Sequence, residues 1–347
     1  MKKPSNLLVY ALIWLLVVGT GSNLSAQSKK EIKKRDAAIQ EAIDQAYDKY
    51  KDLDRGKNAD YIPVLANVPS DLFGIVVVTP DGQIFQKGDV DHHFSIQSIS
   101  KAFVLAYVTE NRGPQIIEDS IGVNPTGQAF NSILPIEQHE GKGINPLVNP
   151  GAIATTSLIH GGSYDEKFNK ILTALSDFAG HDLDVDQEVY ESEAATNERN
   201  RSIAMLLDSY GRIYDEPMES TDIYTKQCAI SVDALDLGVM AGTLANGGVN
   251  PVTGKQVVSS STVSYVLPIM TVAGLYDNSG FWLYNVGVPA KSGVGGGLIA
   301  VVPGKFGIAA FAPPLDEAGN SVKAQMAIYD IIKTLRINPY LIEPSKN

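Results

Sequence analysis

The strongest constraint on the fold is that strand-like runs stand at both ends of the chain. Residues 72–88, "LFGIVVVTPDGQIFQKG", contain two β-rich runs joined by Pro80-Asp81-Gly82, which predicts a hairpin. Far downstream, "GFWLYNVGVPAKSG", "GLIAVVPGK" and "FGIAAFAPP" predict an antiparallel set, with residues 303–305 as a turn. We therefore expect one sheet to be built from the two ends of the chain.

Helical patterns fill the middle of the chain and flank the strands. They include "FSIQSISKAFVLAYVTE", "KFNKILTALSDFA", "TNERNRSIAMLLDSY" and "SVDALDLGVMAGTLANGG", with further helices at 28–52 and at 320–336, where Asn320 or Ser321 would cap the start. This order predicts an α/β (α+β) protein with a helix-covered antiparallel sheet. We expect residues 27–97 and 230–347 to form the sheet subdomain, and residues 98–229 to form an inserted helical subdomain.

Composition narrows the class of protein. The chain of 347 residues is 44% hydrophobic and 19% charged, which is typical of a globular protein. A net charge of -11 argues against a nucleic-acid partner, because phosphate binding needs clustered Lys and Arg. Cys228 is the only cysteine, so no disulfide can form within the chain.

The N-terminus has the layout of a secretory signal peptide. Lys2 and Lys3 precede an apolar run from Leu7 to Val18, and small and polar residues then lead to Ala26. The alternative is a membrane anchor, but the run is short for a span of ~20 residues. We expect residues 1–26 to be removed. The net charge then becomes -13, and the mature protein is periplasmic or secreted with no membrane association.

Three groups of residues match known catalytic or binding motifs poorly. The five histidines belong to no recognisable catalytic motif. The glycines of "GVGGG" at 293–297 do not indicate a phosphate-binding loop, because no Walker lysine accompanies them. We expect them instead to allow a ligand or helix to approach the backbone closely. One acidic run has the spacing of a calcium loop, but Gln187 stands where the turn requires Gly. Its acidic residues are Asp182, Asp184, Asp186, Glu188 and Glu193.

Ser98 and Lys101 make a stronger candidate. They form an S-x-x-K motif at a helix start, and "KSG" at Lys291 to Gly293 begins a strand, as the Lys-Thr-Gly element does in serine β-lactamases. The helix N-terminus favours an alkoxide at Ser98. Lys101 can take the serine proton if burial and the nearby Lys291 lower its pKa.

At this point the chain resembles the serine-dependent glutaminases. "FSIQSISK", "NPLVNPGAIA", "VYESEAATNERNRSIA", "YTKQCAISVDALDLGVMAGTLANGG", "GLYDNSG" and "PAKSGVGGG" are similar to successive signature blocks of that family, from about Gly56 to Lys333. The resemblance implies a fold like that of β-lactamases and penicillin-binding proteins. It also implies hydrolysis of L-glutamine to L-glutamate and ammonia without metal or organic cofactor, and a homo-oligomer, either dimer or tetramer.

The resemblance also implies roles for individual residues. Ser98 matches the nucleophile, Lys101 the base, Tyr224 a proton-relaying tyrosine, and Lys291 the lysine of the KSG element. The positions that match the glutamine-binding residues are Tyr61, Asn149, Glu193, Asn200, Tyr276 and Val294, together with Ser98 and Tyr224. Pro150 departs from the family pattern, which usually has Ala there.

Two other functions use the same motifs. A β-lactam-recognising serine enzyme would share the S-x-x-K and K-S-G pair. However, a pocket with Glu193 suits a zwitterionic amino acid better than the carboxylate of a penicillin. A non-catalytic glutamine-binding protein would use the same pocket without turnover. Ammonia release and labelling by a fluorescent penicillin distinguish the three.

Overall fold

The two ends of the chain meet in one five-stranded sheet. The computed structural model describes residues 7–138 and 144–344, with side chains from residue 29 onward. The sheet has the order β2-β1-β7-β6-β5, and every neighbouring pair is antiparallel. Its strands are β1 (Gly74–Val78), β2 (Ile84–Gly88), β5 (Ala290–Ser292), β6 (Gly297–Val302) and β7 (Phe306–Phe311). The predicted hairpin and the predicted origin of the sheet are therefore confirmed.

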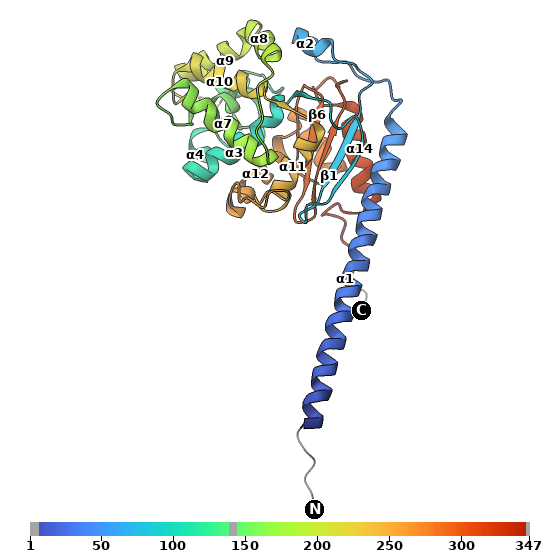
Figure 1. The fold of residues 1–347 in the computed structure, drawn as a ribbon. Helices are drawn as coiled ribbons and strands as arrows, with labels where there is room; N and C mark the ends of the chain where they lie inside the picture. The colour runs from blue at the N-terminus through green and yellow to red at the C-terminus, as the bar shows by residue number, and fades with distance from the viewer. Residues whose placement is uncertain (1–6, 139–143, 345–347) are drawn as a thin grey trace, which may run out of the picture.

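Helices cover both faces of this sheet (Figure 1). Helix α11 (Ala234–Ala245) packs on one face, while α1 (Leu7–Tyr50) and α14 (Val322–Thr334) pack on the other. Alternate residues of β1 explain this arrangement, because Val76 and Val78 join the core under α11. Ile75 and Val77 join the core under α1 and α14. Because β1 is buried on both faces, its sequence is a continuous apolar run and does not alternate between apolar and polar residues.

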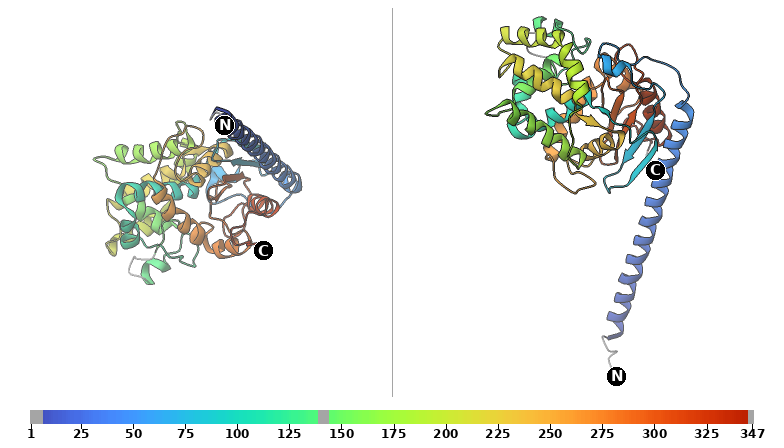
Figure 2. Two further views of the ribbon diagram at one scale, coloured as in Figure 1. Left: turned by 90° about the horizontal axis from the view of Figure 1, so that it is seen from below. Right: turned by 45° about the horizontal axis from the view of Figure 1, so that its top comes forward.

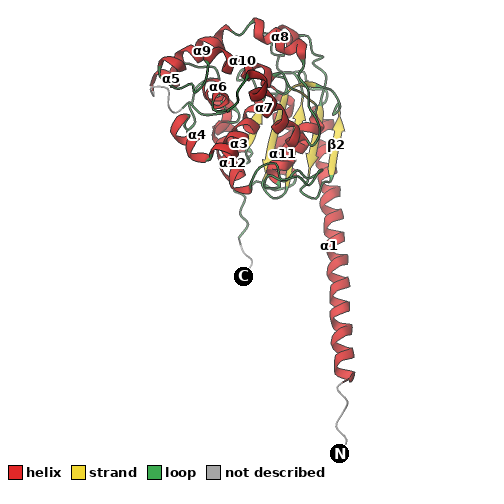
Figure 3. Cartoon of the chain, turned by 60° about the vertical axis from the view of Figure 1, so that its left-hand side comes forward, coloured by secondary structure: helices red, strands yellow, loops and turns green. Residues whose placement is uncertain are grey.

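The middle of the chain forms a group of helices beside the sheet (Figure 3). Between β2 and α11 lie α3 (Ser100–Arg112), α4 (Pro114–Ser120), α5 (Leu134–Gln138), α6 (Asn149–Ser157), α7 (Tyr164–Ala179), α8 (Gln187–Ala195), α9 (Glu198–Ser209) and α10 (Pro217–Cys228). The chain enters and leaves this region through a two-stranded sheet of β3 (Phe94–Ser95) and β4 (Ser231–Val232), in which Phe94 faces Val232. This pairing places the start of α3 at the boundary between the sheet and the helices.

One predicted strand is wrong. The segment beginning at Gly280 forms helix α13 (Ser279–Asn285), and β5 begins only at Ala290. The aromatic residues there favour a strand locally, but Trp282 is buried in the sheet core and its indole N–H donates to the Val288 carbonyl at 2.8 Å. Tertiary packing of this side chain therefore outweighs the local preference.

The remaining elements complete the fold. They are the short helix α2 (Pro63–Ala66), α12 (Ser260–Ala273), and the 3₁₀ turns η1 (Gln97–Ile99) and η2 (Tyr276–Asn278). Ser321 caps α14 by accepting the N–H of Ala324, which settles the choice of cap.

The N-terminal helix is longer than predicted, since α1 begins at Leu7 rather than near residue 28. Its first part extends away from the rest of the molecule (Figures 1 and 2). Its later part packs on the sheet through buried residues that include Ile39 and Ile43. Within the described residues, no helix has the length and apolar character needed to cross a membrane.

Candidate active site

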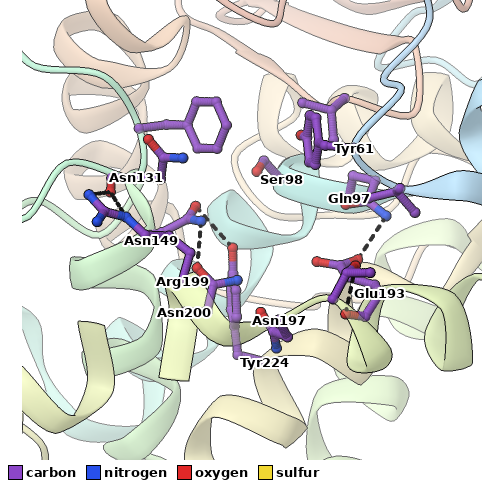
Figure 4. Close-up of a pocket in the computed structure, with 14 residues that line it drawn as sticks. Tyr61, Gln97, Ser98, Asn131, Asn149, Glu193, Asn197, Arg199, Asn200 and Tyr224 are labelled. Carbon is purple, nitrogen blue, oxygen red and sulfur yellow. Dashed lines mark hydrogen bonds between the residues drawn. The ribbon is translucent and has the colours of Figure 1, made fainter. Parts of the chain in front are cut away.

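Seven of the predicted site residues line one pocket between the sheet and the helical region. They are Tyr61, Ser98, Asn149, Glu193, Asn200, Tyr224 and Val294. Figure 4 shows most of them converging on a common space, with Ser98 on one wall and Glu193 on another. The other three predicted residues, Lys101, Tyr276 and Lys291, are buried behind the pocket wall.

Ser98 lies at the junction of two helical turns. It belongs to η1, and α3 begins two residues later, so the N-terminal end of α3 points toward the Ser98 region. The side chain is buried except for a small surface that faces the pocket. The position therefore combines access to a ligand with the positive end of a helix dipole.

Lys101 lies one turn further along and is almost completely buried. Its Nζ donates to Asn149 Oδ1 at 2.7 Å. Burial lowers the pKa of Lys101 to about 8, and the negative charge of Glu193 acts in the opposite direction. About one-tenth of its amino groups is therefore unprotonated at pH 7, far more than for an ordinary lysine, and the unprotonated form can act as a general base.

Asn149 links three side chains across the pocket. Its Oδ1 also accepts the Tyr224 hydroxyl at 3.2 Å, and its Nδ2 donates to Asn200 Oδ1 at 2.9 Å. Pro150 follows in the first turn of α6, where a missing N–H removes no helical hydrogen bond. The substitution at position 150 is thus compatible with Asn149 holding its place in the network.

Glu193 forms the acidic end of the pocket. Burial raises the pKa of Glu193 to about 7, while its hydrogen bond with Gln97 and the charge of Lys101 act to lower it. Gln97 Nε2 donates to Glu193 Oε2 at 3.2 Å. A ligand that brings a positive charge here would favour the ionised carboxylate.

The acidic run around Glu193 does not form a calcium loop. Asp186 is the N-cap of α8 and accepts the Val189 N–H at 3.0 Å, so Gln187 begins a helix instead of making a sharp turn. Across residues 29–138 and 144–344, no group of three or more His, Cys, Asp or Glu side chains is arranged to hold a metal ion.

The KSG strand supports the pocket from behind. Lys291 Nζ donates to the carbonyl oxygens of Ser292 at 2.7 Å and Gly274 at 3.1 Å, and lies 4.2 Å from the centre of the Tyr276 ring. Burial, together with the charge of Lys101, holds the pKa of Lys291 well below its usual range. Lys291 therefore contacts Tyr276 and backbone carbonyls rather than the pocket space.

Tyr276 connects this strand to the nucleophile. Its hydroxyl donates to the Ser292 carbonyl at 3.2 Å. Burial raises the pKa of Tyr276 to about 12, and hydrogen bonding with Ser98 and Ser292 acts to lower it. Tyr61 lies at the pocket mouth with about half of its surface exposed. Its hydroxyl group is the buried part, and this burial raises the pKa of Tyr61. Val294 lies in the turn between β5 and β6.

The glycines around Val294 allow two backbones to approach closely. A Cβ on Gly293 would lie 2.8 Å from the Ile96 carbonyl oxygen, and one on Gly295 would lie 2.4 Å from that of Ser95. The expected close approach is therefore confirmed, but the partner is the backbone of Ser95 and Ile96, which precedes Ser98, and not the expected ligand or helix. Side chains at these positions would push the β5–β6 turn away from the nucleophile.

Several pocket residues were not predicted from the sequence. They are Ile62, Gln97, Phe130, Asn131, Thr196, Asn197 and Arg199. Gln97 could have been suspected because it adjoins Ser98. Arg199 donates from Nε and a terminal nitrogen to the Asn131 carbonyl, at 3.1 and 3.0 Å, which holds a loop against the pocket. That contact spans 68 residues and has no local signal.

Comparisons with known proteins identify a family. A family model described as Glutaminase matches residues 56–340. A glutaminase of Mycobacterium ulcerans is 53% identical over 301 residues, covering 87% of this chain and 94% of the relative. A glutaminase of Brucella canis is 55% identical over 285 residues, covering 82% and 90%.

Solved structures give the same result. A probable glutaminase, ybaS, matches with a TM-score of 0.87 at 48% identity, covering 88% of this chain and 99% of its own. Mglu in its glutamate form matches with a TM-score of 0.82 at 39% identity, covering 86% of this chain and 69% of its own. These likenesses confirm the expected β-lactamase-like fold class, and the chain belongs to the glutaminase family.

Proposed function

We propose that this glutaminase family member hydrolyses L-glutamine to L-glutamate and ammonia through an acyl-enzyme on Ser98. The observation that carries the mechanism is the buried Lys101 amino group, whose pKa is lowered to about 8, one helical turn from the pocket-lining Ser98. A serine hydroxyl is a weak nucleophile, and an adjacent unprotonated amine is one way to activate it.

In this proposal the pocket binds both ends of the substrate. Glu193 receives the α-ammonium group, while Asn149, Asn200 and Tyr61 bind the α-carboxylate and the side-chain amide. The backbone N–H groups of Ser98 and Val294 hold the oxygen that becomes negative in the transition state. No step needs a metal ion or an organic cofactor.

The reaction then proceeds in two halves. Ser98 Oγ attacks the side-chain amide carbon as Lys101 takes its proton. The C–N bond breaks as that proton passes to the leaving nitrogen, and ammonia departs. Water attacks the ester, its proton returns to Ser98 through Lys101, and glutamate leaves. Tyr224 shares the Asn149 Oδ1 acceptor with Lys101, which supports a part for it in moving protons.

The test is ammonia release from L-glutamine by purified residues 27–347 and by Ser98→Ala. The intact protein should turn over, and loss of the nucleophile should lower kcat by several orders of magnitude. Equal rates in the two proteins would contradict the serine mechanism. Absence of ammonia from both, with glutamine binding retained, would instead support a non-catalytic binding protein.

We also propose that the protein is exported and forms a homo-oligomer. Export is supported by the pattern of Lys2, Lys3 and the apolar run before Ala26, and oligomerisation by the resemblance to the family. Mass spectrometry of the native protein should find an N-terminus at Gln27 in a periplasmic or secreted fraction. Light scattering of the mature protein should give the mass of a dimer or a tetramer.

A further inference from the structure

Two residues beside the nucleophile have an unusual backbone. Gln97 has φ of 50° and Tyr276 has φ of 57°, a left-handed conformation that residues other than glycine rarely adopt. Among the residues that the structure describes, only Asn145 and Arg336 are further non-glycine cases. Asparagine tolerates this conformation, and Arg336 follows the end of α14, where left-handed residues commonly terminate helices. Gln97 and Tyr276 have neither explanation.

The same local arrangement holds both residues. Each is the first residue of a 3₁₀ turn, and each has a serine three positions later, Ser100 and Ser279. Ser100 donates both its backbone N–H and its hydroxyl to the Gln97 carbonyl, with the hydroxyl at 2.7 Å. Ser279 donates the same two groups to the Tyr276 carbonyl, with the hydroxyl at 2.8 Å.

Each serine hydroxyl is oriented by a second hydrogen bond. Ser100 Oγ accepts from Gln227 Nε2 at 2.9 Å, and Ser279 Oγ accepts from the Leu275 N–H at 3.0 Å. Both serines are buried, so water does not compete for these groups. The accepted bond leaves the hydroxyl proton free to point at the carbonyl of the left-handed residue.

These two backbones determine how the reacting groups face each other. Gln97 directly precedes Ser98, so its φ angle sets the direction in which the Ser98 side chain leaves the main chain. The Tyr276 hydroxyl donates to the Ser292 carbonyl at 3.2 Å, and the Ser98 side chain is close enough to lower the pKa of Tyr276. If the Gln97 backbone relaxed to an ordinary conformation, the Ser98 side chain that follows it would turn away from Tyr276. If the Tyr276 backbone relaxed, its own side chain would turn away from Ser98.

We propose that Ser100 and Ser279 are positioning residues, which hold Gln97 and Tyr276 in the left-handed conformation that aligns Ser98 with Tyr276. The inference rests on the proposed function for its kinetic consequence, but the backbone effect itself can be measured without activity. It predicts that each hydroxyl affects kcat more than it affects the binding of glutamine.

Ser157 supplies a matched control. Its hydroxyl donates to the carbonyl of Ala154, also three residues earlier, at 2.7 Å, and accepts the Tyr214 N–H at 3.0 Å. It is buried in the last turn of α6, but Ala154 has no positive φ. Ser157→Ala thus removes the same pair of hydrogen bonds from a backbone without strain, away from the pocket.

The first experiment compares Ser100→Ala, Ser279→Ala and Ser157→Ala. The first two should each lower kcat about tenfold, the rate equivalent of one net hydrogen bond, and change KM less than about threefold. Ser157→Ala should lower the melting temperature while leaving kcat unchanged. If Ser100→Ala fails to fold, Gln227→Leu removes the donor that orients Ser100 and should lower kcat in the same direction. Unchanged kcat in both site variants, or an equal loss in Ser157→Ala, would overturn the proposal.

The second experiment is a double-mutant cycle with Gln97→Gly. Glycine adopts a left-handed backbone without a steric penalty, so the Ser100 hydroxyl should matter less once it is present. Gln97→Gly alone lowers activity by removing the contact with Glu193, and the comparison is therefore made within that background. There, Ser100→Ala should change kcat less than about threefold and destabilise the fold less than it does in the natural sequence. Additive effects in the urea unfolding midpoint would refute the positioning role, even if the protein did not hydrolyse glutamine at all.

Discussion

Burial shifts the pKa values of Lys101, behind the pocket wall, and Glu193, in the pocket, in opposite directions. It lowers the pKa of Lys101 to about 8 and raises the pKa of Glu193 to about 7, so both titrate near neutral pH. Desolvation disfavours whichever form is charged, which explains why a base and an acid move toward each other on the pH scale. Lys101 thereby becomes available to accept a proton, and Glu193 becomes sensitive to a cationic ligand.

The expected consequence is a pH-dependent kcat. Lys101 must be unprotonated to act, so kcat should rise about tenfold per pH unit below about pH 8 and level off above it. Steady-state rates with saturating glutamine between pH 6 and 9.5 measure this. Lys101→Arg should lose several orders of magnitude, because a guanidinium cannot serve as a base.

Glu193→Gln provides the control for that profile. It should raise KM at least about tenfold by removing the partner of the α-ammonium group. It should move the rise of kcat only slightly to lower pH, because the Glu193 charge raises the pKa of Lys101 but burial dominates it. A kcat that is flat over the whole range would show that Lys101 is not the base. A shift of the rise in Glu193→Gln by more than about one unit would assign it to Glu193 instead.

At the scale of elements, the short helix α8 carries Glu193 and begins at a capping residue, Asp186. Helix α8 has nine residues, and Val189 is its only buried apolar side chain, so little apolar packing holds it in place. The Asp186 cap satisfies the Val189 N–H at the start of the same helix that carries Glu193. Isolated helices of this length are unstable, so cap and tertiary contacts decide where Glu193 lies.

Asp186→Ala should therefore affect binding as well as stability. Loss of the cap should cost about 1 kcal/mol in the free energy of unfolding and raise KM for glutamine several-fold, with a smaller change in kcat. Asp186→Asn should retain both values, because asparagine is an equally good cap.

Ser163 caps α7 through the Glu166 N–H at 3.2 Å, and α7 contributes no residue to the pocket. Ser163→Ala should thus lower stability by a similar amount without raising KM. Urea denaturation and steady-state kinetics on the three variants provide the comparison. Equal KM in all of them would show that α8 is held in place without its cap.

At the scale of the whole molecule, the pocket is assembled from segments that the sheet and the helical region bring together. Ser98 lies at the β3–α3 junction, Val294 lies in the β5–β6 turn, and Glu193 lies in α8. The positions that would hold the α-ammonium group and the reacting carbonyl therefore belong to different parts of a rigid scaffold. Their separation is fixed by the fold and not by one flexible loop.

This fixed separation predicts strong discrimination against asparagine. Asparagine is one methylene shorter and cannot satisfy Glu193 and Ser98 together. One missing methylene is worth only about 10–200-fold, but an unpaired buried polar group adds to the penalty. We expect kcat/KM for asparagine to be at least about 10³-fold below that for glutamine, as measured by ammonia release from each amide.

Pro150→Ala tests whether the departure from the family pattern affects this result. Asn149 is held by Lys101, Asn200 and Tyr224, so the discrimination should stay within about threefold of the natural protein. Comparable rates on the two amides in the natural protein would show that the separation is not fixed. Restored discrimination in Pro150→Ala would then identify the loop at Asn149 as the cause.

Much of the fold was determined by short-range chemistry that the sequence displays directly. The turn residues at Pro80-Asp81-Gly82, the alternating or continuous apolar runs and the cap at Ser321 each act over a few residues, and the structure confirms these elements. The spacing of Ser98 and Lys101 is also a local property. Adjacent helical turns place the two residues on one side of the chain wherever the segment lies.

Tertiary structure decided the properties that depend on distant segments. The pKa of Lys101 follows from burial among residues such as Asn149, which is 48 positions away, and α13 is a helix because Trp282 fits the sheet core. The left-handed backbones of Gln97 and Tyr276 are unfavourable in isolation and need the surrounding hydrogen bonds. Local preference cannot predict such features, because desolvation and strain arise only when remote parts of the chain pack together.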